Sequence, residues 1–402
     1  AVSFITRAPR EDFAFEQSAG YGSRDLLSSR TVVHSGDLLG GKLRASATYL
    51  HTERDGVVDN INAPDDGDPG AYDRDVARVA LRFSPTEDVT IDYAWDWSDV
   101  TNVPGAFQLF ATVPYVASFL ADSPRFGGSS VLISDERQGS LSLDARSTAV
   151  EDDLDGHSLV LTADFEAFTL KSISAWRDSS HDTPANNLDG LPPDVRGLLL
   201  DPDTFEFRGV GTYELYGGYG STETQDQFQQ ELTLVSTGSG PWQWTVGAFY
   251  FEESTDSSDP QFYTYILEPL PPVPFPLGLP LSATTAYESD ADSFAVYAQA
   301  SYRPPSLDDR LGITVGARYS WDQRSLDQDQ PFVNRGDASF SEPTGHVSID
   351  WRLDDRSTVY ARISHGYRSG GFNVRTLQAA FDPEFIDQFE IGLKSDLLED
   401  RL

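Results

Sequence analysis

The sequence predicts an all-β fold, a transmembrane antiparallel β-barrel, and three observations lead to this prediction. Apolar and polar residues alternate with a period of two in many segments of about 9 to 12 residues. Several segments end in aromatic residues on the apolar face, and the connections between segments alternate between short and long. Tilted strands that cross a bilayer have this length, and outer-membrane barrels have short turns on one side and long loops on the other.

The segment LGITVGARYSWD at 311 to 322 has the clearest alternation. Its apolar face carries Leu311, Ile313, Val315, Ala317, Tyr319 and Trp321, and its other face Gly312, Thr314, Gly316, Arg318, Ser320 and Asp322. Segments 89–98 and 346–353 divide in the same way. We expect the aromatic pairs at the headgroup level, where such rings gather in membrane proteins. These pairs are Tyr319 with Trp321 and Trp95 with Trp97.

The same pattern along the chain predicts about 14 strands. They are expected near 14–22, 27–35, 42–52, 74–83, 88–98, 156–166, 167–179, 222–236, 241–254, 289–303, 309–325, 341–353, 355–367 and 384–396. Short turns are expected at 36–41, 84–87, 166–167, 237–240, 304–308, 354 and 397–400. Long polar loops are expected at 53–73, 99–155, 180–221, 255–288, 326–340 and 368–383, and the first outward connection, around 23–26, is short. Antiparallel neighbours place alternate connections on opposite sides of the membrane, so the long loops share one side.

Two of the long loops have a distinct composition. The stretch EPLPPVPFPLGLP at 268 to 280 favours a stiff polyproline conformation and is expected to be a rigid surface loop, with a partner-binding motif as the alternative. The stretch DNINAPDDGDPGAYDRD at 59 to 75 is rich in carboxylates, which favours calcium. It lacks the spacing of a calcium-binding loop, so a solvated acidic loop is the expectation.

Composition excludes several classes of protein. The net charge of -35 argues against a nucleic-acid partner, which needs clustered basic residues. The chain contains no cysteine, and therefore no disulfide or thiolate site is expected. It contains no methionine either, so we expect it to be an excerpt of a longer chain. No apolar run approaches the roughly 18 to 20 residues that a spanning helix needs.

No motif for catalysis stands out, so the chain is not expected to be an enzyme or to hold a cofactor or metal. The six histidines are scattered without metal-binding spacing. Glu252 and Glu253 are adjacent, and adjacent side chains on a strand point to opposite faces, which does not suit a glycosidase pair. No G-x-S-x-G elbow is present, and Gly209-Val210-Gly211 lacks the rest of a dinucleotide fingerprint.

The stretch YARISHGYRSGGFN at 360 to 373 alternates and then turns rich in glycine. Its spacing fits no phosphate-binding loop, so we interpret the glycines as the point where a strand leaves the membrane. Alternation places Val359, Ala361, Ile363 and Tyr367 on the lipid face, with His365 at the interface, and Arg362, Ser364, Gly366 and Arg368 toward the lumen. Candidates for contact with a ligand in the lumen or at its mouth are Arg318, Arg362, Arg368 and Asn373.

Several segments, in order, resemble TonB-dependent outer-membrane receptors. AVSFITRAPR at 1 to 10 resembles the last strand of that family's plug domain. QFQQELTLVS at 227 to 236 with WQWTVGAFYF at 242 to 251, and the stretch 293 to 323 with its G-x-R-Y run at Gly316, Arg318 and Tyr319, resemble family hairpins. VYARISHGYRSGGFN at 359 to 373 and EFIDQFEIGLKSDLLEDRL at 384 to 402 are similar to the hairpin that follows.

The resemblance implies a barrel of about 22 strands with a plug inside. Residues 1–12 would be the C-terminal tail of the plug and residues 13–402 a partial barrel with long extracellular loops, lacking roughly eight strands, most of the plug and the TonB box. Such an excerpt is expected not to close into a stable barrel, because unpaired sheet edges are costly in lipid.

The implied function is import of a scarce large ligand across the outer membrane of a Gram-negative bacterium. The ligand would be a siderophore, haem, cobalamin or glycan. The implied partners are TonB and its inner-membrane motor, the surrounding lipid and lipopolysaccharide, and the small-molecule or oligosaccharide ligand. A passive porin-like barrel and a soluble secreted β-protein are the alternatives.

Overall fold

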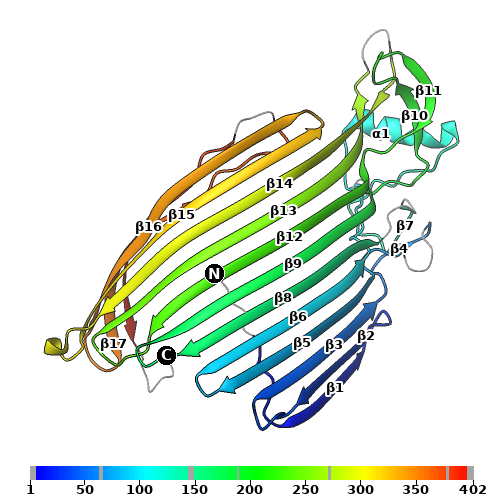
Figure 1. The fold of residues 1–402 in the computed structure, drawn as a ribbon. Coiled ribbons are helices and arrows are strands. Elements are labelled where there is room, and N and C mark those ends of the chain that lie inside the picture. The colour runs from blue at the N-terminus through cyan, green and yellow to red at the C-terminus, as the bar shows by residue number, and fades with distance from the viewer. Residues whose placement is uncertain are drawn as a thin grey trace.

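The computed structural model describes residues 6–62, 67–143, 149–187, 190–269, 273–376 and 380–395, with side chains except at 184–187, 218 and 219. Fourteen strands of one sheet follow one another as antiparallel neighbours (Figure 1). They are β1 (Phe13–Tyr21), β2 (Leu27–Ser35), β3 (Leu43–Arg54), β5 (Tyr72–Thr86), β6 (Val89–Asn102), β8 (Val150–Asp164), β9 (Phe168–Asn187), β12 (Tyr216–Ser236), β13 (Trp242–Leu267), β14 (Leu277–Tyr302), β15 (Leu311–Gln330), β16 (Asn334–Arg352), β17 (Ser357–Arg368) and β18 (Glu384–Ser395). The predicted fold and all fourteen strand positions are confirmed.

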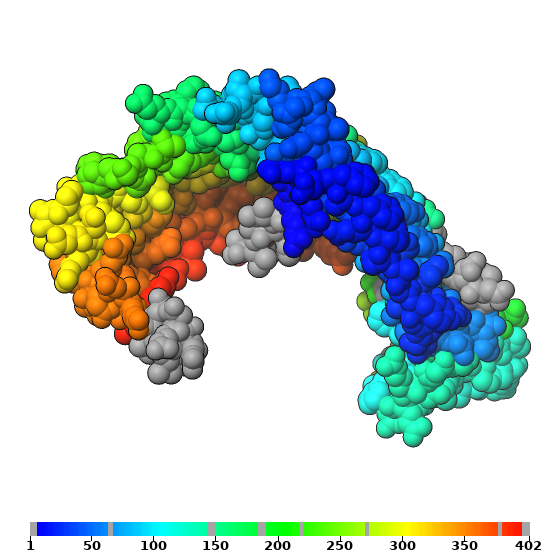
Figure 2. Space-filling model, turned by 90° about the horizontal axis from the view of Figure 1, so that it is seen from below, coloured from blue at the N-terminus to red at the C-terminus, as the bar shows by residue number. Residues whose placement is uncertain are grey.

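The sheet curves into an arch around a hollow and does not close (Figure 2). Within the described residues β1 pairs only with β2, and β18 only with β17. None of the described helices is long and apolar enough to cross a membrane.

The two faces of the sheet differ as the alternation predicts. Val315, Val347 and Ile363 lie side by side on β15, β16 and β17 and are 49%, 37% and 51% exposed. The opposite face carries ion pairs between neighbouring strands, such as Arg82 with Asp92 at 2.6 Å. The apolar face is therefore the outer, lipid-facing one, and the polar face lines the hollow.

Aromatic side chains form a band on the outer face. The Trp321 ring stacks on Phe294 with centroids 5.6 Å apart, and Trp176 lies 5.2 Å from Phe228. Trp321 is 43% exposed, so its ring is available to the membrane interface. The predicted outward position of Tyr319 and Trp321 is confirmed.

Two of the expected long loops are largely strand. In the stretch 255–288, β13 runs to Leu267 and pairs there with Leu277 at the start of β14. In the stretch 326–340, Asp327 on β15 lies opposite Arg335 on β16 and forms an ion pair with it at 2.6 Å. Cross-strand pairs of this kind let the hairpins continue beyond the apolar band. The polar composition of these stretches led to the prediction of loops instead of strands.

The two loops with a distinct composition also differ from expectation. Residues 277–280 of the proline-rich stretch belong to β14, so the polyproline conformation predicted for them is wrong, and residues 270–272 lie outside the described part of the chain. In the acidic stretch, β4 (Asp59–Asn60) pairs in parallel with β7 (Ser140–Leu141), and Tyr72 begins β5. Residues 63–66 and the expected turn at 397–400 lie outside the described residues.

The long insertions around 99–155 and 180–221 fold together into what we call the outer cap. It consists of α1 (Pro114–Ala121), the short helix η1 (Ser123–Phe126), the hairpin of β10 (Arg196–Leu200) and β11 (Phe207–Thr212), and the outer ends of β13 and β14. The cap stands at the end of the sheet with the long connections (Figure 1). At the opposite end, η2 (Pro305–Leu307) lies in the short turn between β14 and β15.

A hydrophobic core holds the outer cap together. Its buried side chains are Phe119, Leu120, Leu191, Val195, Leu199 and Tyr213. Leu199 of β10 lies opposite Gly278 of β14, which joins the cap to the sheet. The expectation of long polar loops is wrong here, because apolar residues from two insertions meet in the fold and form a core.

The turn of the β10–β11 hairpin depends on one carboxylate. Asp201 Oδ1 accepts hydrogen bonds from the backbone N–H groups of Asp203 and Thr204, each at 3.0 Å. These bonds favour the ionised form and hold the pKa of Asp201 below its ordinary value.

A carboxylate with a lowered pKa stabilises the fold above its unfolded pKa of about 3.9, and this stabilisation is lost as the pH falls through the lower folded pKa. We expect the protection of the Asp203 and Thr204 amides from hydrogen exchange to fall in this acidic window. In Asp201→Ala, protection should be low at every pH. Asp201→Asn retains an acceptor without the charge, so its protection should not follow pH; a pH dependence like that of the native chain would contradict this explanation.

Candidate ligand-binding site

The inner face of β12 and β14–β17 lines a cavity of about 760 Å³, which we call the inner cavity. Among its lining residues are Glu231, Tyr297, Arg318, Asp322, His346 and Arg362. Two of the four predicted residues, Arg318 and Arg362, thus lie in one cavity, as strand alternation predicts.

Arg318 is held by aromatic rings. Its guanidinium carbon lies 5.3 Å from the centroid of Phe249 and 5.9 Å from that of Tyr297, and its Nε donates to Ser320 at 3.0 Å. The Tyr297 hydroxyl donates to the Glu231 carboxylate at 2.6 Å. Neither Arg318 nor Arg362 forms an ion pair with any residue that the structure describes, so both present positive charge to the hollow.

Tyr367 lies on the inner side, so its predicted lipid-facing position is wrong. Its hydroxyl donates to the carboxylate of Asp322 on β15. Pairing of β17 with β16 stops at His365, two residues earlier, whereas pairing with β18 continues to Arg368. Tyr367 is therefore held in the sheet on one side only, by β18, and alternation no longer predicts the direction of that side chain.

Two glycines, Gly370 and Gly371, follow the end of β17. A Cβ at Gly370 would lie 2.1 Å from the Phe381 carbonyl oxygen and 2.6 Å from the Phe340 ring, so only glycine fits. This agrees with the interpretation of the Gly-rich turn as the end of a strand.

The other two predicted residues do not join the cavity. Arg368 is exposed and lies 3.9 Å from Glu384, its partner on β18. The Asn373 side-chain oxygen accepts from the Arg375 backbone N–H at 2.9 Å, so it is used within its own turn.

A second cavity, the outer cavity, lies on the inner face where β9, β12, β13 and β14 extend toward the cap. Its volume is about 350 Å³, and it is lined by His181, Thr183, Tyr216, Glu223, Tyr287 and Arg375, among others. Arg375 lies 3.8 Å from Asp259, and His181 Nδ1 lies 2.5 Å from Asp152. Sequence reasoning missed this cavity, because its residues come from four strands and a distant loop.

The pairing of β3 with β5 also brings together three side chains whose proximity the sequence did not predict. His51 on β3 lies 3.0 Å from Asp75 and 3.6 Å from Asp73 on β5. The three offer ligand atoms within 4.8 Å of one another, but the hydrogen bond to Asp75, shared with the Tyr49 hydroxyl at 2.5 Å, accounts for the arrangement.

A family model described as TonB dependent receptor-like, beta-barrel, matches residues 118–402. The chain belongs to the TonB-dependent receptor family. Members of this family are transport receptors of the Gram-negative outer membrane, and that is the location of this chain.

Solved receptors share the fold. The ferric yersiniabactin uptake receptor FyuA from Yersinia pestis is similar with a TM-score of 0.67 at 18% identity, covering 97% of this chain and 53% of that receptor. The siderophore receptor PiuA from Acinetobacter baumannii has a TM-score of 0.68 at 12% identity, covering 98% of this chain and 56% of that one. The pesticin receptor of Yersinia enterocolitica is 30% identical over 101 residues, which is 24% of this chain and 14% of that protein. The chain thus spans about half the length of the solved receptors.

Proposed function

We propose that this chain is part of a receptor that imports a ferric siderophore through the outer membrane with energy relayed by TonB. The observation that carries the proposal is the position of residues 6–12 against the inner face of the first strands. Arg78 of β5 donates to the Thr6 hydroxyl at 3.1 Å, and the Arg10 N–H to His34 of β2 at 3.3 Å. A segment that lies against the inner face of the wall before β1 is expected of a plugged receptor, with residues 1–12 as the plug tail, rather than of a passive porin.

The ligand class rests on similar receptors whose names specify ferric chelates, among them FyuA and the ferric citrate transporter FecA. The outer cavity suits a first contact with such a ligand. Tyr216 and Tyr287 offer rings that stack on apolar or planar groups, and Arg375 offers a positive charge to an anionic chelate.

Arg318 and Arg362, deeper in the hollow, would face the plug or the passing ligand, whereas Arg368 and Asn373 take no part. TonB would engage a segment outside this chain, and lipid with lipopolysaccharide would surround the outer face. No bond in the ligand is made or broken, so no catalytic residue or cofactor is assigned.

Uptake by cells tests this function. A strain whose only receptor is the full-length protein is supplied with ⁵⁵Fe bound to yersiniabactin, to citrate or to a catecholate. We expect saturable uptake of one of them that stops when tonB is deleted. Uptake that rises linearly with concentration and persists without tonB would instead identify the passive porin-like alternative, and no uptake of any probe would reject the ligand class.

Removal of Arg375 tests the outer cavity. Loss of a charged hydrogen bond costs about 1.5 to 3 kcal/mol, so Arg375→Ala should weaken binding of the transported probe by about tenfold to a hundredfold. Arg368→Ala is the matched control, because Arg368 is in the same region and pairs with Glu384 at the surface. Equal affinities of the two variants would remove Arg375 from the site.

A further inference from the structure

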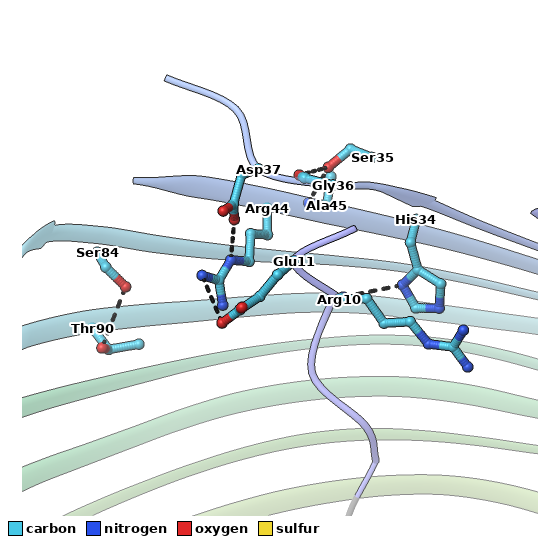
Figure 3. A network of polar contacts seen from close by, with 10 residues as sticks. All are labelled: Arg10, Glu11, His34, Ser35, Gly36, Asp37, Arg44, Ala45, Ser84 and Thr90. Carbon is cyan, nitrogen blue, oxygen red and sulfur yellow. Dashed lines mark hydrogen bonds and ion pairs between the residues drawn. The ribbon is translucent and has the colours of Figure 1, made fainter. Parts of the chain in front are cut away.

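Three charged side chains tie the segment before β1 to the turn between β2 and β3. Arg44 of β3 contacts Asp37 through Nε at 2.6 Å and Glu11 through Nη2 at 3.1 Å (Figure 3). Glu11 precedes β1, and Asp37 lies in the turn between β2 and β3. We call Glu11, Asp37 and Arg44 the junction clamp.

The backbone is fixed at the same place. The Asp37 N–H donates to the Glu11 carbonyl at 2.8 Å, which continues the pairing of Phe13 with Ser35 by two residues. Gly36 has a φ of +70°, and a Cβ there would lie 2.7 Å from the Phe13 nitrogen. The chain therefore passes against this turn with no space for a side chain between them.

Contacts become sparse on the other side of the clamp. Pro9 is buried, whereas Thr6, Arg7 and Ala8 are exposed, and the contact of Thr6 with the described part of the barrel is a hydrogen bond from Arg78. The segment is thus firmly attached at residues 9–13 and loosely attached at residues 6–8.

We propose that import through this receptor requires the plug to rearrange and that the junction clamp is the fixed end of the plug. Rearrangement of the plug stops at residues 9–13, and Arg44 is a positioning residue that holds them on the rim of the barrel. Isolated surface ion pairs contribute little, but Arg44 is shared by two carboxylates, and its side chain is only 23% exposed. This inference rests on the proposed assignment of residues 1–12 to the plug tail.

A covalent link in place of the clamp tests the proposal. The chain has no cysteine, so Glu11→Cys with Asp37→Cys in the full-length receptor introduces one pair at opposed positions. The first readout is killing by vancomycin, a large antibiotic that the outer membrane excludes, and it does not require the transported ligand. The second is uptake of whichever ⁵⁵Fe probe the receptor transports.

We expect the oxidised pair to exclude vancomycin and to transport like the native receptor. The reduced pair and Arg44→Ala should lower the inhibitory concentration of vancomycin several-fold, with Arg44→Lys between them and the native receptor. Arg303→Ala, which breaks a comparable pair with Asp350 at 2.8 Å on the same rim, is the control and should have no effect.

Two results would overturn the proposal. Uptake that stops in the oxidised pair and returns on reduction would mean that residues 9–13 must move. If Arg44→Ala excluded vancomycin as well as the native receptor does, Arg44 would not be needed to hold residues 9–13 in place. Heat-modifiable migration on gels shows for each variant whether the barrel has folded. Absence of uptake in every strain, including the native one, would speak only against the proposed function.

Discussion

Phe119→Ala should open the outer cap while leaving the barrel intact. Phe119 is 3% exposed, and its ring lies 4.6 Å from that of Tyr213. It also fills the space beside two glycines, since a Cβ at Gly197 would lie 2.4 Å from its Cζ. Removal of such a ring costs about 3 to 5 kcal/mol. The amides of the cap should therefore exchange about a hundredfold faster or more.

Hydrogen exchange of β10 and β11 amides in the full-length receptor measures this effect. Phe110→Ala is the matched control, because Phe110 is 67% exposed and should change exchange little. Gly197→Ala should also destabilise the cap, but less so when Phe119 is already alanine, because the truncated side chain leaves space for the added methyl group. Unchanged exchange of β10 in Phe119→Ala, or additive effects in the double variant, would contradict the packing described.

Val315→Arg should destabilise the barrel far more than Thr314→Arg, although the two positions are adjacent. Val315 lies on the outer face opposite Ala300 and Val347, near the middle of the apolar band. Thr314 contacts the Ser301 hydroxyl at 2.8 Å on the inner face. An arginine exposed to the middle of the bilayer costs about 2 to 4 kcal/mol.

Urea unfolding of the full-length receptor in lipid vesicles measures the difference. Val315→Leu keeps the apolar character and should unfold close to the native midpoint. Thr314→Arg loses one hydroxyl contact, but the new arginine is solvated on the inner face. Its loss of stability should therefore be smaller. If Thr314→Arg lost as much stability as Val315→Arg, the assignment of inner and outer faces would be wrong.

The barrel wall could be predicted from the sequence because its information is local. Each strand shows the alternation that its two environments impose, and a pair such as Val315 and Thr314 needs no knowledge of distant residues. The same alternation correctly places Arg318 and Arg362 in one cavity. It fails at Tyr367, beyond the last pair of β17 with β16, because the strand there is held by a neighbour on one side only.

The cap and the outer cavity could not be predicted, because they depend on contacts between distant segments. Phe119 and Leu199 lie in insertions without any periodic pattern, and nothing in the local sequence shows that their two segments meet in the fold. His51 and Asp75 likewise meet only through the register of β3 with β5. Sequence spacing of histidines, the usual signal for such a group, carries no information about partners on a neighbouring strand.

The shared core of the outer cap also bears on how such receptors diversify. Phe119 comes from one insertion and Leu199 from another. Both pack against Gly278, which lies at the outer end of β14. A recombination event that exchanges one insertion alone would leave half of this core without its counterpart. The three segments should therefore be inherited as a unit, and a chimaera that receives all three should retain a folded cap where single exchanges do not.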